Sequence, residues 1–179
     1  MNFMLKLSIF FLLGLFTVNS ATADPPRKKK KNLWQTWPEV NNGLNTEKKP
    51  LLIDVYTNWC HYCKLMDATT YNNDSVYNYL KKNYYRYKFN AETKDTLIWQ
   101  NKQYVYNNRY EVHDFAVYLS RGNIVYPTTV IITPGGQPYY QFGQLKPGEL
   151  EMLLKYFSEK QQTGISLEEY AKSFKPTWK

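Results

Sequence analysis

Residues 51–67, LLIDVYTNWCHYCKLMD, contain the only two cysteines of the 179-residue chain. Cys60 and Cys63 stand three positions apart, where one sequence pattern gives way to another. The apolar and β-branched residues of Leu51–Tyr56 predict a buried central strand. Helix-forming residues with apolar side chains at helical spacing follow in Cys60–Asp67. The cysteine pair is therefore expected where a strand passes into the first turn of a helix.

This position has consequences for the chemistry of the two thiols. Residues i and i+3 of a helix have Cβ atoms about 5–6 Å apart, so a small adjustment brings Cys60 and Cys63 within disulfide distance. Cys60 is expected at the helix N-terminus, where unpaired N–H groups and the helix dipole favour a negative charge. The pKa of its thiol should fall there, and the thiolate is the attacking species in thiol–disulfide exchange. Cys63, one turn further on, would be shielded and would resolve a mixed disulfide.

Three other functions of a Cys-x-x-Cys pair compete with a redox couple. A zinc site needs three or four protein ligands, but the chain adds only two histidines to its cysteines, His61 within the pair and His113, isolated on a predicted helix. Haem attachment needs a histidine directly after the second cysteine, where Lys64 stands. A purely structural disulfide would close a very short loop and constrain the unfolded chain little. The sequence therefore favours a redox dithiol without a bound metal.

The rest of the chain has the pattern of an α/β protein. Crossover helices imply parallel pairing in its first half, and the turn Pro134-Gly135-Gly136 implies an antiparallel hairpin in its second. One predicted helix follows Trp37-Pro38, and the others cover Ser75–Lys82, Glu111–Ser120, Pro147–Gln162 and Ser166–Phe174. Asp74 is expected to cap the helix Ser75–Lys82, Gly164 to end the helix Pro147–Gln162, and Ser166 to cap the last one. Predicted strands cover Tyr84–Phe89, Thr128–Thr133 and Pro138–Phe142, with a hairpin of Thr96–Trp99 and Gln103–Tyr106 after the first.

Two segments carry a resemblance to a known family. LLIDVYTNWCHYCKLMD resembles the active-site segment of the thioredoxin superfamily, in which a hydrophobic strand with an aspartate precedes Trp-Cys-x-x-Cys-Lys. Residues 126–143, YPTTVIITPGGQPYYQFG, are similar to that family's Pro-Thr strand, glycine-containing turn and next strand. The resemblance covers about residues 33–163 and is greatest to exported thioredoxin-like proteins with Cys-Lys-x-Met and Thr-Tyr-x-x-x-x-Val. It implies a thioredoxin-like α/β fold, with a central mixed sheet flanked by helices and an inserted hairpin-containing segment before the cis-proline strand.

The resemblance also assigns roles to individual residues. Cys60 matches the nucleophile, Cys63 the resolving thiol, and Trp59 the tryptophan that packs beside the pair. For Trp59 this role is compatible with ordinary core packing, the other interpretation. Asp54, six residues before Cys60, matches the family's buried acid. A carboxylate in an apolar strand is costly without a role or a partner, and burial would raise its pKa and suit it to exchange a proton with Cys63 through water. The alternative is a strand-end carboxylate in solvent.

Further positions are expected to contact substrate. Pro127 matches the family's cis-proline opposite the disulfide, and Tyr126 before it would touch the substrate, whereas a trans-proline opening an edge strand is the alternative. His61 and Tyr62 occupy the positions of Gly-Pro in thioredoxin. A protonated His61 beside Cys60 would stabilise the thiolate and make the couple more oxidising, and the alternative is an exposed imidazole that does not tune the couple. The expected substrate-binding residues are Trp59, His61, Tyr62, Tyr126 and Pro127.

The stretch Ala91–Gly122 is longer than the corresponding connection in thioredoxin. Its aromatic residues include Trp99, Tyr104, Tyr106 and Tyr110. Two roles stay open for these residues: they pack over a sheet edge, or they form a surface that binds substrate or partner proteins. Residues 164–179 are expected to add a helical extension, so that the domain spans residues 33–179.

The first 23 residues have the pattern of a secretory signal peptide. A short basic start precedes a 12-residue apolar run, residues 7–18, and Ala21-Thr22-Ala23 fits a small-x-small cleavage site. The run is too short for a membrane-spanning helix, which needs about 20 residues. Positive charge directly after the run disfavours export, so an uncleaved or inverted segment is the alternative. Cleavage near Ala23 would place the protein in the periplasm or another extracytoplasmic compartment.

The net charge of +8 is mostly local. Residues 32–179 hold 17 Lys and Arg and 14 Asp and Glu, whereas a basic cluster lies in residues 24–32, which are expected to form a disordered leader. The cluster consists of Arg27, Lys28, Lys29, Lys30 and Lys31. Weak contact with an anionic membrane surface is the functional alternative for this cluster. Nucleic-acid binding is not expected, because no basic motif with interleaved aromatic residues accompanies it.

Together these features predict an exported thiol–disulfide oxidoreductase that reduces disulfides of substrate proteins through Cys60 and Cys63. An oxidising compartment would keep the pair oxidised without a supply of electrons, so a membrane-borne thiol electron donor is an expected partner. No nucleotide-binding fingerprint occurs, and no cofactor is expected. Two alternatives stay open: the reverse reaction, as a disulfide oxidase or isomerase, and a non-enzymatic binding module of the same fold.

Overall fold

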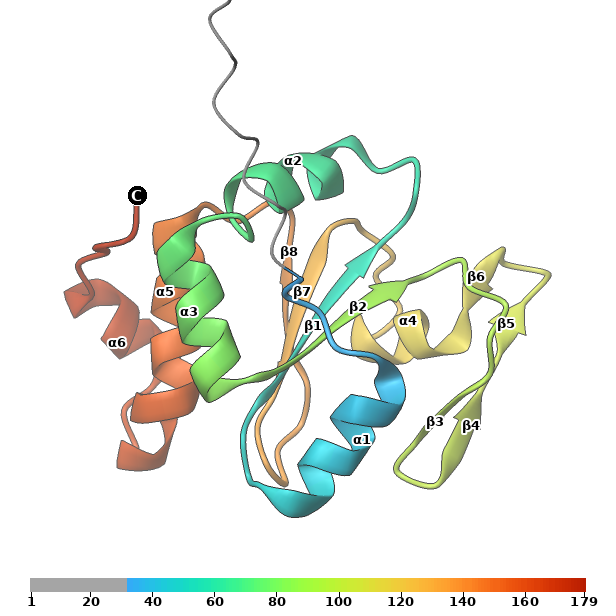
Figure 1. Cartoon of the computed structure of the whole chain (residues 1–179), viewed down its shortest axis with the longest axis horizontal. Helices are drawn as coiled ribbons and strands as arrows, with labels where there is room; N and C mark the ends of the chain where they lie inside the picture. The colour runs from blue at the N-terminus through green and yellow to red at the C-terminus, as the bar shows by residue number, and fades with distance from the viewer. Residues whose placement is uncertain (1–31) are drawn as a thin grey trace, which may run out of the picture.

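The computed structural model describes residues 32–179, which form a central four-stranded sheet with helices on both faces (Figure 1). The strand order is β2-β1-β7-β8, in which β1 pairs with β2 in parallel and the other neighbours are antiparallel. The strands are β1 (Leu51–Tyr56), β2 (Tyr85–Asn90), β7 (Thr128–Ile132) and β8 (Tyr139–Phe142). The mixed sheet predicted from the sequence is confirmed.

The N-terminal predictions fall outside this part of the chain. The expected signal peptide, residues 1–23, and the five basic residues of the leader lie outside the described residues. Over residues 32–179, every helix is too short or too polar to cross a membrane. Export, cleavage and membrane contact therefore stay predictions.

Six α-helices surround the sheet in residues 32–179. Figure 1 shows α1 and α4 on one side of the sheet, α3, α5 and α6 on the other, and α2 across one end of the strands. The helices are α1 (Trp37–Thr46), α2 (His61–Thr69), α3 (Asp74–Asn83), α4 (Asp114–Leu119), α5 (Pro147–Lys155) and α6 (Leu167–Ser173).

Alternation along β1 divides the apolar core between the two faces of the sheet. Leu51, Ile53 and Val55 pack with residues of α1 and α4, whereas Leu52 packs with residues of α2, α3 and α5. Because successive side chains of a strand point to opposite faces, Asp54 lies on the same face as Leu52. Both faces are covered, so this carboxyl group is withdrawn from water.

The insertion before β7 contains two hairpins rather than the single one predicted. In the first, β3 (Leu97–Trp99) pairs with β4 (Lys102–Tyr104), close to the predicted residues. In the second, β5 (Tyr106–Asn107) pairs with β6 (Val112–His113). The second hairpin was missed because its strands are only two residues long, too short for an alternating pattern.

Aromatic side chains of the insertion pack onto the core. Trp99 and Tyr104 are buried, and the ring of Phe115 from α4 contacts both. Trp37 of α1 adds a 3.2 Å hydrogen bond from its Nε1 to a backbone carbonyl of β3. Of the two roles expected for these aromatic residues, Trp99 and Tyr104 therefore have the packing role. Tyr110 is 67% exposed and stays available to a partner.

Two helices begin elsewhere than predicted. Asn73 rather than Asp74 caps α3, because Oδ1 of Asn73 accepts two backbone N–H groups of the first turn. α4 begins at Asp114 rather than Glu111, because the left-handed backbone of Glu111 (φ +51°) does not continue a right-handed helix. His113 is buried and caps α4, with its Nδ1 accepting a backbone N–H. Burial lowers the pKa of His113, which favours the neutral ring that can accept this bond.

The C-terminal helical region is less regular than predicted. After α5 the chain continues as a π-helical turn, Tyr156–Lys160, and a 3₁₀ turn, Gln161–Thr163. Gly164 ends this region with a φ of +82°, a conformation that favours glycine, as predicted. Ser166 caps α6, also as predicted.

The last residues return to α5 and pack against it. The carboxylate of Glu151 is buried and accepts the backbone N–H groups of Thr177 and Trp178, at 2.6 and 2.8 Å. It also accepts the hydroxyl of Thr177 and a hydrogen bond from Lys155, both at 2.6 Å. This carboxylate therefore anchors the C-terminal extension.

Candidate active site

The turn between β1 and α2 places Cys60 at the start of the helix. Cys60 has extended backbone angles (φ −65°, ψ 108°) and is the N-cap residue of α2. Its Sγ accepts the backbone N–H of Cys63 at 3.1 Å. The two sulfurs form a disulfide, with Cα atoms 5.3 Å apart. The structure thus places both cysteines as the strand-to-helix pattern predicts.

The same geometry favours a thiolate on Cys60 once the disulfide is reduced. An N-cap side chain supplies an acceptor for N–H groups that have no partner within the helix. The N–H of Cys63 and the positive end of the α2 dipole both lie at the Cys60 sulfur, and both stabilise negative charge there. In the disulfide form Cys60 is 4% exposed and Cys63 is 2% exposed, so little of either side chain is open to solvent.

Asp54 lies beneath α2 and is 1% exposed, so the solvent-exposed alternative is wrong. Parallel pairing aligns Asp54 with Lys88 of β2, whose Nζ lies 3.3 Å from Oδ2 of Asp54. Withdrawal from water raises the pKa of Asp54 to about 6; Lys88 opposes this rise, and the nearby Asp67 adds to it. The pKa of Asp54 is thereby brought toward neutral pH, which suits the predicted proton exchange with Cys63.

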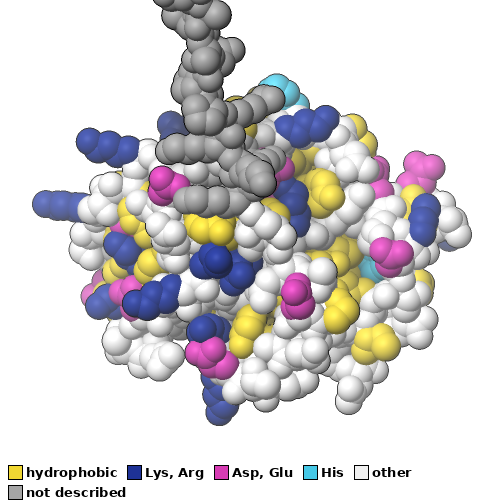
Figure 2. Space-filling view, viewed as in Figure 1, with side chains coloured by type: hydrophobic (Ala, Val, Ile, Leu, Met, Phe, Trp, Pro, Cys, Tyr) yellow, Lys and Arg dark blue, Asp and Glu magenta, His cyan; other side chains and the backbone are white. Residues whose placement is uncertain are grey.

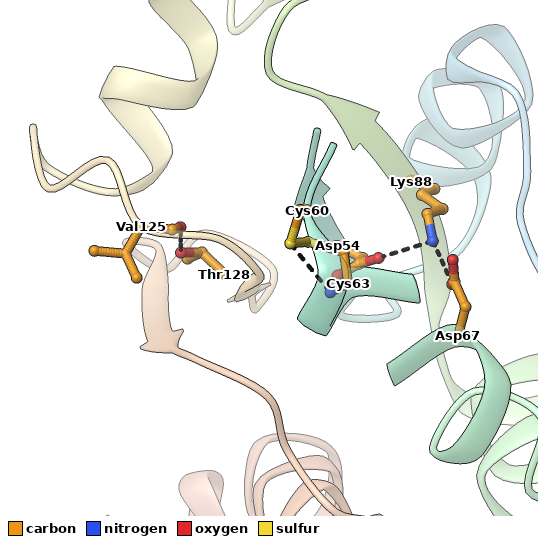
Figure 3. Close-up of a disulfide and its surroundings, with 7 residues drawn as sticks. All are labelled: Asp54, Cys60, Cys63, Asp67, Lys88, Val125 and Thr128. Atoms are coloured by element: carbon orange, nitrogen blue, oxygen red, sulfur yellow. Dashed lines mark hydrogen bonds and ion pairs between the residues drawn. A yellow bond between two sulfur atoms is a disulfide. The ribbon is translucent and has the colours of Figure 1, made fainter. Parts of the chain in front are cut away.

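Lys88 links Asp54 to the surface of the protein (Figure 3). Its ammonium group also donates a hydrogen bond to Asp67 of α2, which is more exposed than Asp54. A cleft of about 440 Å³ is lined in part by Asp67 and Lys88. The sequence analysis did not identify Asp67 or Lys88 as site residues. Their only signal in the sequence is that each is a charged residue within an amphipathic element.

Trp59 is 67% exposed, so ordinary core packing is wrong for it. Its Nε1 donates a 2.8 Å hydrogen bond to Oε1 of Glu92, at the start of the insertion. Its ring meets that of Tyr126 edge-on, with centroids 5.8 Å apart. Burial, with Glu92 nearby, raises the pKa of Tyr126 to about 12. Three separate segments thus hold a protruding indole next to Cys60, and Glu92 is a contributor that the sequence reasoning missed.

The turn before β7 contains the expected proline. The Tyr126–Pro127 peptide bond is cis in the structure. The hydroxyl of Thr128 donates a 2.5 Å hydrogen bond to the carbonyl of Val125, which closes the turn around Pro127. In the view of Figure 3, Val125 and Thr128 lie on the opposite side of the cysteine pair from Lys88.

His61 and Tyr62 occupy the first turn of α2 and face solvent. Tyr62 is 59% exposed, and His61 is also exposed. Their rings meet edge-on with centroids 5.6 Å apart. Both therefore lie on the exposed surface around Cys60, while their contact with substrate and the influence of His61 on the couple stay predictions.

The described residues offer no ready metal site. Residues 32–179 contain no group of three His, Cys, Asp or Glu side chains placed to hold a metal ion. The ring of His113 is engaged on both sides, with Nδ1 accepting a helix N–H and Nε2 lying 2.9 Å from the carbonyl of Asp95. His113 is therefore a structural residue of the insertion.

The mixed sheet, the Cys-x-x-Cys disulfide at the start of α2 and the proline turn before β7 define a thioredoxin-fold protein with a dithiol–disulfide site. A sequence profile described as a thioredoxin-like domain matches residues 42–158. The chain belongs to this thioredoxin-like family. With its cysteine pair in place, it is a thiol–disulfide oxidoreductase rather than a non-enzymatic binding module.

Solved structures share the fold at low sequence identity. A thioredoxin-fold protein from Helicobacter pylori is 16% identical with a TM-score of 0.52, over 70% of this chain and 79% of that chain. A thioredoxin from Thermus thermophilus is 15% identical with a TM-score of 0.53, over 74% of this chain and 92% of that chain. These likenesses show the fold alone. A comparison with curated protein sequences gives no significant match.

Proposed function

We propose that this oxidoreductase is exported and reduces disulfides in substrate proteins. The observation that carries the proposal is the position of the Cys60 sulfur, 3.1 Å from the N–H of Cys63 at the start of α2 and bordered by the exposed Trp59 and Tyr62. A sulfur so placed is stabilised as a thiolate and is surrounded by side chains on which a protein can dock. The apolar run in residues 7–18 and the cleavage pattern after it support export.

The reaction proceeds in two exchanges. The Cys60 thiolate attacks one sulfur of the substrate disulfide, forms an intermolecular disulfide, and releases the other substrate sulfur as a thiolate that takes up a proton. Cys63, after giving its proton toward Asp54, then attacks the sulfur of Cys60. The Cys60–Cys63 disulfide reforms and the substrate leaves with two thiols, so two electrons have passed from the protein to the substrate.

Repeated turnover needs a source of electrons. The pair must be reduced again after each cycle, and an oxidising compartment does not do this. A membrane-borne thiol protein, exchanging with the Cys60–Cys63 disulfide by the same chemistry in reverse, fits this requirement. The sequence carries no nucleotide-binding fingerprint through which the domain could take electrons from a dinucleotide.

The opposite direction, disulfide oxidation or isomerisation, is the second candidate function. The observation in its favour is His61, exposed at the first position of α2 and next to Cys60. If His61 is protonated there, it stabilises the reduced couple and makes the protein more oxidising.

The reduction potential, measured against glutathione, separates these functions. A potential of about −270 mV, as in thioredoxin, supports reduction, whereas a potential of about −120 mV supports oxidation. Trapping with Cys63→Ser in cells should leave substrate proteins attached to Cys60, and the Cys60→Ser variant is the matched control. Fractionation of the same cells tests export, because captured proteins from the cytoplasm alone would contradict it.

A further inference from the structure

A cleft beside the cysteine pair extends onto the insertion. It has a volume of about 770 Å³. We call it the insertion groove and define it by Trp59, Glu92, Tyr110, Glu111, Ile124 and Tyr126. Trp59 and Tyr126 precede Cys60 and Pro127, whereas Tyr110 and Glu111 belong to the loop of the β5–β6 hairpin. When the cysteine of a substrate is bound to Cys60, the substrate residues next to that cysteine can therefore reach the groove.

The groove is bordered by exposed apolar side chains. Trp59 and Tyr110 are each 67% exposed, and Ile124 is 41% exposed. Val125, which follows Ile124 in the chain, is 45% exposed. Apolar side chains gathered around a cleft next to a reactive site are typical of a surface that binds another protein.

The charged residues of the groove are acidic. Glu92 and Glu111 line it, and none of its described lining residues is Lys or Arg. Glu92 uses Oε1 to bind the indole of Trp59, whereas Glu111 forms no ion pair with any residue in the range 32–179. Arg109, which lies 5.6 Å from the ring centroid of Tyr110, does not line the groove.

This acidity does not follow from the charge of the whole domain. Residues 32–179 carry more Lys and Arg than Asp and Glu, 17 against 14. On the face shown in Figure 2, side chains of both charges lie toward the insertion hairpins, so the acidity is a property of the groove lining and not of the whole insertion. A cationic segment is therefore attracted to the groove although the domain as a whole repels it weakly.

From this combination we infer that the insertion groove binds an extended segment of the substrate protein next to its target cysteine, and that it selects segments carrying a large apolar side chain and a Lys or Arg. The inference rests on the proposed function, because it names the substrates of the same cysteine pair. The apolar side chain packs against Trp59 and Tyr110. The cation pairs with Glu111 and with the second oxygen of Glu92.

The test uses the reduced full-length protein and three synthetic peptides. Each peptide carries one cysteine as a mixed disulfide with 5-thio-2-nitrobenzoate and a leucine beside it. The peptides differ only in having Lys, Gln or Glu two residues from the cysteine. The Cys60 thiolate attacks the peptide sulfur and the nitrobenzoate thiolate leaves, because the thiol of lower pKa is the better leaving group. The absorbance of the released thiolate gives the second-order rate constant.

At low ionic strength the Lys peptide should react about tenfold faster than the Glu peptide, with the Gln peptide between them. The ratio should fall toward one at about 1 M salt, where the Debye length is about 3 Å. Glu111→Gln and Glu92→Gln should each lower the ratio, and the double variant should abolish it. Glutamine at position 92 retains an acceptor for the Trp59 N–H. Glu168→Gln, an exposed change on α6, is the matched control and should leave the ratio unchanged.

The outcomes separate this inference from the proposed function. Equal rates for the Lys and Glu peptides, a faster Glu peptide, or a ratio that persists in the double variant would overturn the inference and leave the proposed function standing. If no peptide reacts faster with the protein than with free glutathione, the proposed function fails and the inference fails with it.

Discussion

The ammonium group of Lys88 lies 3.3 Å from Oδ2 of Asp54, the buried carboxyl group beneath the helix that carries the cysteines. The same ammonium donates a hydrogen bond to Asp67, so one cation serves two carboxyl groups. Its attraction does not offset the lost hydration of Asp54, since the pKa of that group is about 6 rather than 3.8. Removal of a charge from water often costs more than one ion pair returns. The protonation of Asp54 therefore depends on both burial and Lys88.

The first prediction concerns stability. Asp54 holds its proton up to a pH of about 6 when folded but only to about 3.8 when unfolded, so the folded state binds more protons between these values. Stability from this group is thus present below pH 4 and is lost as pH rises through 6. Asp54→Asn should raise the free energy of unfolding at pH 8 by up to about 3 kcal/mol and change it little at pH 4. Urea denaturation of the disulfide form measures both values, and an equal effect at the two pH values would contradict the assignment.

Asp54→Asn should also slow dithiol turnover. We expect the carboxylate form of Asp54 to accept the proton of Cys63 in the native protein, so the rate of insulin reduction should rise as pH passes through about 6. The variant lacks this rise and should be slower at pH 7 by about tenfold or more. An unchanged pH–rate profile would remove Asp54 from the mechanism, even if its effect on stability is confirmed.

Lys88→Met should move the same transition to higher pH. Lys88 lowers the pKa of Asp54, so its removal raises that pKa further above 6, and the rise in rate shifts with it. The variant should be less stable at pH 8 by up to about 3–5 kcal/mol, because a buried carboxylate loses its partner, and by less at pH 4. The matched control is Lys64→Met, an exposed position on α2. The prediction is wrong if both variants retain the native pH–rate profile.

A fourth prediction concerns the C-terminal extension. Burial raises the pKa of Glu151, but hydrogen bonds from Lys155, Thr177 and Trp178 outweigh this and lower it overall. A carboxyl group with a lowered pKa contributes stability above its unfolded pKa and loses it as pH falls through the folded value. Glu151→Gln should therefore cost about 2 kcal/mol at pH 7 and less in acid.

Hydrogen exchange checks where this loss occurs. The amides of Thr177 and Trp178 donate directly to Glu151 and should exchange faster in the variant. Glu168→Gln removes an exposed pair with Lys172 and should change stability by less than about 1 kcal/mol. Unchanged exchange at both amides would show that Glu151 does not anchor the extension.

Much of the fold could be predicted because strands, turns and caps are local properties of the chain. The run Leu51–Tyr56 and the glycine turn after Thr133 lie in the structure where the sequence places them. Helix starts were less certain for a physical reason. Asn73 and Asp74 can both cap a helix, so residue type alone does not distinguish them, and in the structure Asn73 is the cap.

The sequence by itself determined that Cys60 and Cys63 meet at a helix start. Residues three positions apart in a helix are neighbours, and the chain contains no other cysteine with which either could pair. Only the tertiary structure decided what surrounds them. Lys88 reaches Asp54 through the register of two parallel strands, and Glu92 reaches Trp59 across 33 residues of chain. Periodicity reports which face of an element is apolar but not which residues of distant elements become neighbours. The electrostatics beneath the cysteines and the groove beside them therefore depend on how the sheet and insertion pack.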